Sequence, residues 1–153
     1  MMKRFVLIAL AAVAAILLVR GWGSDASDDS RGKLAFDRLW IDHVPRNDKD
    51  PVQVFVMITK QPLGVFEAAS RWRGRFEAFQ YKRGDRGTVA VHYPQSGDTE
   101  KVSVRARECG RGEFEYCLEI EGSSRGVKSY VSKKAWVIRS VDEGKATLDS
   151  LTP

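Results

Sequence analysis

The sequence predicts an all-β domain, built as a single antiparallel up-and-down β-barrel of 8–9 strands, with a β-sandwich as the alternative. Two observations carry this prediction. Between Leu34 and Arg139 the chain breaks into apolar-rich segments of about five to ten residues, separated by Gly, Pro, Asp and Ser. No segment in that range has both the length and the period of an amphipathic helix. The tight spacing of the turns favours the up-and-down barrel.

The expected strands alternate between apolar and polar residues and end at turn-forming residues. In chain order they cover residues 36–43, 52–59, 65–72, 75–82, 88–93, 101–109, 113–121, 127–132 and 135–139. Together they make a barrel domain over residues 34–140. The remaining residues, 141–153, are weakly patterned and are expected to form a short helix or to be disordered.

The amino terminus has the layout of a secretory signal. Lys3 and Arg4 precede an uncharged apolar run at 5–19, and a small polar stretch follows. As a hydrophobic helix this run would reach about 22 Å, against a bilayer core of about 30 Å. Residues 1–26 are therefore expected to be a signal peptide or an uncleaved membrane anchor, followed by a flexible linker at 27–33. Either alternative places the domain outside the cytoplasm: periplasmic, secreted, or membrane-anchored and facing outward.

The net charge limits the partners of such a domain. The formal charge of the chain is +5. Lys3, Arg4 and Arg20 against Asp25 give the leader +2, so residues 27–153 carry +3. The acidic partners outside the cytoplasm are anionic lipid and polysaccharide, and we expect no nucleic-acid partner.

The two cysteines are expected to form a disulfide. If Cys109 lies opposite Cys117 in a hairpin centred on Glu113, the same register sets Arg107 opposite Glu119. Both cysteines then fall on the solvent-facing side of an exported domain, where disulfides persist. The closed loop is worth about 2.6 kcal/mol in the chain-entropy model.

A second hairpin covers the arginine-rich stretch SRWRGRFEAFQYKRGDRG at 70–87. A two-residue turn at Arg73 and Gly74 would set Ala68 opposite Phe79 and Phe66 opposite Tyr81. The aromatic residues then face the interior and cannot stack on nucleic-acid bases. The basic residues gather at the ends of the hairpin as a candidate anion-binding rim, which comprises Arg71, Arg73, Arg75, Arg83 and Arg86.

Nothing in the sequence nominates an enzyme, a cofactor or a metal site. The chain lacks the common hydrolase, protease and nucleotide-binding motifs. His43 follows Asp42, but neighbouring strand residues point to opposite faces, which argues against a relay between them. Two cysteines and two distant histidines do not make a ligand set.

Several aromatic residues are expected to point into the barrel and to form a candidate ligand-binding interior. They are Trp40, Phe66, Phe79, Tyr81, Phe114 and Tyr116, and the wider inward set includes Val54 and Val56. In an eight-stranded barrel such residues either fill the interior or line a cavity for one small ligand.

The strand order and the aromatic interior resemble a small lipocalin-like barrel. The Gly-x-Trp signature of lipocalins is missing, because Trp40 follows Arg38 and Leu39 in FDRLWIDHV. The runs DRLWIDHVPRNDKDPVQVFV and SRGVKSYVSKKAWVI are also similar to small exported bacterial proteins without an assigned activity. The resemblance implies a non-enzymatic barrel that binds an apolar or amphipathic small molecule. The alternative is an envelope interaction or structural protein that holds anionic lipid or polysaccharide on its basic surface.

Overall fold

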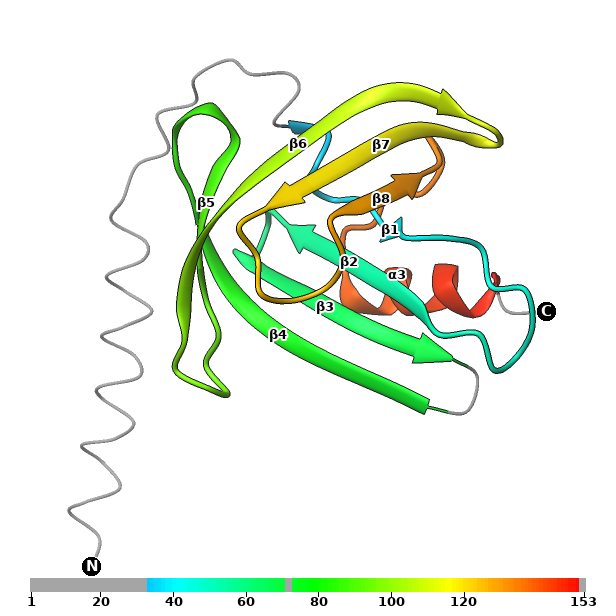
Figure 1. The fold of residues 1–153 in the computed structure, drawn as a ribbon, viewed down its shortest axis with the longest axis horizontal. Helices are drawn as coiled ribbons and strands as arrows, with labels where there is room; N and C mark the ends of the chain where they lie inside the picture. The colour runs from blue at the N-terminus through cyan, green and yellow to red at the C-terminus, as the bar shows by residue number, and fades with distance from the viewer. Residues whose placement is uncertain (1–32, 71–72, 152–153) are drawn as a thin grey trace, which may run out of the picture.

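A computed structural model describes residues 33–70 and 73–151 (Figure 1). The predicted leader and nearly all of the predicted linker lie outside these residues. The described part is built from strands and ends in one short helix. Its elements are β1 (Trp40–Ile41), β2 (Val52–Ile58), β3 (Leu63–Ser70), β4 (Arg73–Arg83), the 3₁₀ turn η1 (Asp85–Gly87), β5 (Thr88–His92), β6 (Thr99–Arg111), β7 (Phe114–Glu121), β8 (Ser129–Ser132) and α3 (Val141–Asp149).

The strands form a closed antiparallel barrel. Each strand pairs with the next one along the chain, and β8 pairs back with β1 where Ile41 lies opposite Val131. This confirms the up-and-down barrel and shows that the sandwich alternative is wrong. The described barrel has eight strands, and the expected strand at 135–139 contributes only an isolated bridge from Val137 to Arg38.

Aromatic side chains fill the interior of the barrel. The ring centroids of Phe55 and Phe66 are 4.9 Å apart, and those of Phe66 and Phe79 are 5.2 Å apart. Gly64 faces these rings, and a Cβ atom there would lie 2.1 Å from Phe79 Cζ. The glycine is therefore needed to admit the Phe79 ring, and the interior is close-packed around it.

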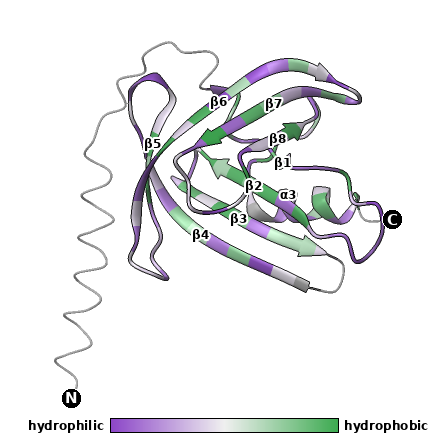
Figure 2. Ribbon diagram, in the orientation of Figure 1, coloured by the Kyte–Doolittle hydropathy of each residue, from purple (hydrophilic) through white to green (hydrophobic). Residues whose placement is uncertain are grey.

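A second apolar cluster covers part of the outer wall. Val54 and Val56 of β2 belong to this cluster, whereas Phe55 between them points inward. The expectation that the two valines point inward is therefore wrong. Figure 2 shows that hydrophobic residues prevail along β2. A strand buried on both faces is a nearly continuous apolar run in the sequence. The alternation that would show which residues point inward is then lost.

The segment after β8 covers these outward residues. Trp136 and Ile138 are buried in the outer cluster, and Leu148 of α3 packs against it. The helix α3 begins after Ser140, whose Oγ accepts a hydrogen bond from the Glu143 amide. In residues 33–70 and 73–151, no helix is long and apolar enough to cross a membrane.

The β3–β4 hairpin has a different register from the one expected. Ala68 lies opposite Arg75 and Ser70 lies opposite Arg73, so the connection falls at residues 71–72, outside the described residues. Arg73 and Gly74 belong to β4, and Gly74 lacks the positive φ that a two-residue turn there would require. The expected pairings of Phe66 and Phe79 are therefore wrong. The shift is even, so these rings keep their inward direction.

The β6–β7 hairpin is also shifted, by two residues. Arg107 lies opposite Cys117, and Glu119 lies opposite Arg105 rather than Arg107. The pairing becomes irregular between Glu108 and Arg111, as at a β-bulge.

The disulfide between Cys109 and Cys117 is confirmed, with a Cα–Cα distance of 5.7 Å. It joins residues that are not directly opposite, because the bulge brings Cys109 toward Cys117. Cys117 does not face solvent as expected, since it is 7 % exposed and lies in the outer apolar cluster beside Val131. The disulfide therefore links β6 to β7 at a position where the outer apolar cluster covers Cys117.

Candidate functional site

Residues 34–38, which we call the amino-terminal cap, close one end of the barrel. Ala35 is 1 % exposed, and its carbonyl accepts a hydrogen bond of 3.1 Å from the buried Trp40 Nε1. Phe36 packs against the interior, with its ring centroid 5.5 Å from that of Tyr81. The Asp37 amide donates to the Met57 carbonyl. Apolar contacts and backbone hydrogen bonds seal this end. Polar side chains add to it, because the Asp37 carboxylate accepts from Thr59 and Arg38 donates to the Lys133 carbonyl.

Residues 122–128, which we call the loop cap, join β7 to β8 over the interior aromatics. The Val127 amide donates to Tyr130 Oη at 3.0 Å, and the Val127 side chain packs against the interior cluster. Gly126 has φ of +68°, and a Cβ atom there would lie 2.2 Å from Tyr130 Oη and 2.8 Å from Phe66. The backbone at Gly126 therefore rests directly on the interior aromatic side chains.

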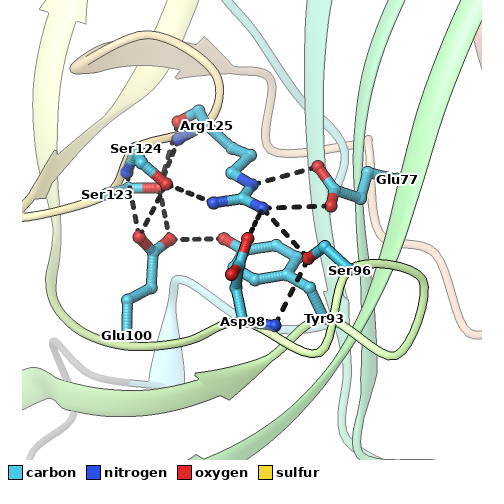
Figure 3. Close-up of polar contacts among 8 residues, drawn as sticks. All are labelled: Glu77, Tyr93, Ser96, Asp98, Glu100, Ser123, Ser124 and Arg125. Carbon is cyan, nitrogen blue, oxygen red and sulfur yellow. Dashed lines mark hydrogen bonds and ion pairs between the residues drawn. The ribbon is translucent and has the colours of Figure 1, made fainter.

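Arg125 connects the loop cap to two neighbouring parts of the wall (Figure 3). Its Nε lies 3.1 Å from Glu77 Oε2 of β4, and its Nη2 lies 2.7 Å from Asp98 Oδ2 in the β5–β6 loop. The guanidinium carbon also lies 4.1 Å from the ring centroid of Tyr93, which places the cation over the ring. One side chain therefore ties together three segments that are distant in sequence.

Glu100 forms the second half of the same cluster. It accepts hydrogen bonds from Tyr93 Oη, from Ser123 Oγ at 3.0 Å, and from both the amide and the hydroxyl of Ser124. Burial raises the pKa of Glu100, but these hydrogen bonds together outweigh it and lower the pKa. Burial, with the bond to Glu100, raises the pKa of Tyr93.

The chemistry of this cluster suits holding rather than reacting. The pKa of Asp98 is lowered, first by the hydrogen bond from Arg125 and then by Ser96. Neither Asp98 nor Glu100 has the raised pKa of a carboxyl group that donates a proton near neutral pH. Each is already engaged by groups of the chain itself, so the cluster secures the loop cap.

A basic hollow of about 560 Å³ lies on the outer side of the wall. It is lined by Lys82, Arg83, Gly84, Asp85, Arg86, Thr88, Ala90 and Lys101. The register explains the depression, because Ala90 of β5 lies between Lys82 of β4 and Lys101 of β6 in one cross-strand row. The small Ala90 side chain forms the floor of the basic hollow, and the longer side chains of Lys82 and Lys101 form cationic walls on either side.

The connection η1 shapes one side of the basic hollow. Arg86 adopts φ of +54°, which is unusual for a residue with a side chain. The turn is held by Thr88, whose hydroxyl donates to the Asp85 carbonyl at 2.7 Å. Arg83 is held differently, because its guanidinium carbon lies 3.5 Å from the ring centroid of Phe36 in the amino-terminal cap. The hollow thus adjoins the point where the described chain begins.

The structure brings together only part of the predicted anion-binding rim. Arg83 and Arg86 line the basic hollow, whereas Arg75 is exposed near the opposite end of β4. Arg71 and the side chain of Arg73 lie outside the described residues. Sequence reasoning missed Lys82 and Lys101, which meet only through the register across β5.

The predicted interior residues mostly lie where they were expected. Trp40, Phe66, Phe79, Tyr81 and Tyr116 belong to the interior cluster. Phe114 does not, because it packs edge-on against Trp136 in the outer cluster, with the ring centroids 5.8 Å apart. Phe114 is the first residue of β7 and lies opposite Arg111, at the edge of the irregular pairing of β6.

A second hollow, of about 380 Å³, also lies outside the wall. Its lining includes His43, Phe114 and Val131. The expected separation of Asp42 and His43 is wrong, because both residues follow the end of β1 and their side chains meet at 3.0 Å. His43 Nε2 lies 3.3 Å from Asp50, so the histidine sits between two carboxylates of the β1–β2 loop.

Among the residues that the structure describes, no group of three or more His, Cys, Asp or Glu side chains is placed to hold a metal ion. No protein-family model, curated protein sequence or solved structure matches the chain.

Proposed function

We propose that the protein is a non-enzymatic extracytoplasmic barrel that uses the basic hollow to hold an anionic group of the cell envelope. The ligand chemistry is a phosphate or carboxylate carried by a lipid or a polysaccharide. The observation that carries the proposal is the composition of the hollow. Four cationic side chains line it, and Asp85 is the one carboxylate among its lining residues.

The geometry of the arginines favours a bound anion. A guanidinium group presents several N–H donors in a plane and pairs with phosphate or carboxylate through two hydrogen bonds. Arg83 is positioned by the Phe36 ring, and Arg86 by the left-handed backbone of η1. Holding these side chains in place before binding reduces the conformational entropy that an anion would otherwise have to offset.

Two features support a location outside the cytoplasm. The sequence of residues 1–26 has the pattern of an export signal, and the disulfide suits an oxidising compartment. Lys33 is the first described residue, and its carbonyl accepts a hydrogen bond from the Phe36 amide. The Phe36 ring in turn lies beneath the Arg83 guanidinium group. A retained leader would therefore hold the basic hollow close to the membrane surface.

The interior is the weaker candidate in this conformation. The aromatic rings around Phe79 are in mutual contact, and the two hollows described above both lie outside the wall. An apolar ligand would need the interior to open, so the ligand-binding hypothesis stays a prediction.

Vesicle binding tests the proposal directly. The purified protein would be mixed with phosphatidylcholine vesicles with and without phosphatidylglycerol, and separately with the anionic polysaccharide dextran sulfate. We expect binding only where anions are present. It should weaken steeply as salt rises from about 0.05 to 0.5 M, because the Debye length is about 10 Å at 0.1 M and shorter above it. Binding that is insensitive to salt would contradict the proposal.

Charge-matched variants separate the hollow from the general basicity of the chain. Lys82→Gln with Lys101→Gln removes two charges from the hollow, and Lys49→Gln with Lys145→Gln removes two exposed charges elsewhere. We expect the first pair to weaken binding at least about tenfold more than the second, a difference of about 1.4 kcal/mol. Equal losses would mean that net charge alone attracts the anion.

A further inference from the structure

We infer that the loop cap is a lid, and that Gly126 and Val127 occupy the place of an apolar ligand at the end of the barrel. Arg125 secures this lid, and its displacement opens a site for a single acyl chain or a molecule of similar shape. This inference is independent of anion binding at the basic hollow, which lies on the outer wall.

The contacts beneath the lid define the site. Gly126 rests on Phe66 and on Tyr130, and the ring centroid of Phe55 lies 4.9 Å from that of Phe66 and 5.7 Å from that of Tyr130. Val127 packs on the same interior cluster. When residues 126–127 withdraw, these aromatic side chains lose their cover and become a concave apolar surface, which is the usual lining of a small-molecule site.

The contacts that hold the lid differ from those beneath it. Ser123, Ser124 and Arg125 bind the carboxylates of Glu77, Asp98 and Glu100 (Figure 3). The side chain of Asp98 is 56 % exposed, and that of Arg125 is 23 % exposed. The side chain of Glu77, the other ion-pair partner of Arg125, is 27 % exposed, and water and salt compete for the exposed parts of these pairs. The lid is therefore shaped to fit the interior but is fastened by contacts that water can replace.

A closed lid lowers the apparent affinity for a ligand in proportion to the population of the open form. Variants that loosen the lid should therefore bind more tightly, although they touch none of the ligand-contacting rings. Arg125→Gln removes the charge that pairs with Glu77 and Asp98. Gly126→Ala places a methyl group where Tyr130 Oη and Phe66 now lie, which forces the backbone away.

The test uses N-phenyl-1-naphthylamine, a neutral dye that fluoresces in apolar surroundings and has no charge for the basic hollow to attract. Arg125→Gln and Gly126→Ala are each compared with the natural chain. The matched control is Arg46→Gln, which breaks an exposed ion pair with Asp50 in the β1–β2 loop. We expect both lid variants to bind the dye about tenfold more tightly, and the control to match the natural chain.

A second measurement does not depend on the variants remaining folded. In the natural chain, saturating dye should speed hydrogen exchange at the amides of residues 123–127, because the ligand displaces the lid. The inference is overturned if dye leaves that exchange unchanged, or if folded lid variants bind dye no better than Arg46→Gln. Failure here would leave salt-sensitive vesicle binding intact, so the two proposals fail separately.

Discussion

At one end of the barrel the amino-terminal cap inserts apolar side chains into the interior, and at the other the loop cap is tied to the wall through an arginine and its carboxylate partners. The amino-terminal cap buries Ala35 and stacks Phe36 against Tyr81. The loop cap lays Gly126 over the interior rings but is held in place through Arg125.

This difference between the two caps indicates which end of the barrel we expect to open. Apolar burial stabilises at about 25 cal/mol per Å² and involves no charge that salt screens or acid titrates. The ion pairs of Arg125 are partly exposed and are weakened by salt and by acid. Two ends of one barrel therefore share an aromatic interior but respond to different conditions.

The largest expected effect comes from placing a charge at each end. Ala35→Asp would bury a carboxylate without a partner in the amino-terminal cap, so we expect a loss of about 3 kcal/mol or more in the free energy of unfolding. Ser96→Asp adds the same group near Arg125 in an exposed loop and should change stability by less than about 0.5 kcal/mol. Urea unfolding followed by tryptophan fluorescence measures both, and similar losses would refute the contrast.

Removing the disulfide should have the next largest effect, and it should spare the lid. Tyr116 precedes Cys117 and lies under Arg38 of the amino-terminal cap, so the disulfide belongs to the apolar end of the barrel. Replacing both Cys109 and Cys117 with Ala is expected to lower the free energy of unfolding by about 2.6 kcal/mol. Binding of the neutral dye at low urea should stay as it is in the natural chain. Tighter dye binding in this variant would show that the two ends are coupled.

Salt offers a smaller effect on the folded chain alone. Hydrogen exchange at residues 123–127 should accelerate between about 0.05 and 1 M NaCl, because screening weakens the pairs of Arg125. Exchange at the Asp37 amide, which donates to the Met57 carbonyl, should not change. If hydrogen exchange depended equally on salt at both ends, the polar contacts of Arg125 would not be what holds the loop cap in place.

Acid should produce the smallest effect. The pKa values of Asp98 and Glu100 are lowered in the folded chain, so their stabilising contribution is complete above the ordinary range near 4 and is lost as the pH falls through the lowered values. Glu77, Tyr93 and Arg125 are the other ionisable groups of the cluster.

We therefore expect neutral dye to bind more tightly at pH 3 than at pH 7. The change should be smaller in Arg125→Gln, because Arg125 is the main cause of the lowered pKa of Asp98. A fluorescence titration at each pH measures it. An identical pH response in the two proteins would show that another group controls the lid.

Strand alternation made the fold predictable, whereas pairing between strands was harder to derive. Phe66, Phe79 and Tyr81 point inward as expected because the β3–β4 hairpin is shifted by an even number of residues, which preserves their faces. The registers themselves were wrong because Arg-Gly at 73–74 is a weaker turn signal than Asn-Gly, and because a bulge interrupts β6. Val54 and Val56 were misplaced because the covering segment after β8 buries the outer face of β2.

The candidate sites were less predictable because they depend on distant pairings. Arg83 and Arg86 flank an obvious turn, but Lys82 and Lys101 approach each other only across the floor at Ala90. Arg125 reaches Glu77 over 48 residues of sequence, and no local motif marks either residue. Such contacts follow from the closure of the barrel and leave no pattern in neighbouring residues.

The short seam between β1 and β8 has a consequence for how the chain is made. Ile41 meets Val131 there, and Arg38 reaches the Lys133 carbonyl across 95 residues. Synthesis proceeds from the amino end, and β8 is the last strand along the described chain, so β1 to β7 are synthesised before the strand that closes the barrel. Until Val131 emerges, the nascent chain is an open sheet with two unpaired edges, which favour association with other chains. Pairing of β8 with β1 thus turns an open sheet into a barrel without free edges.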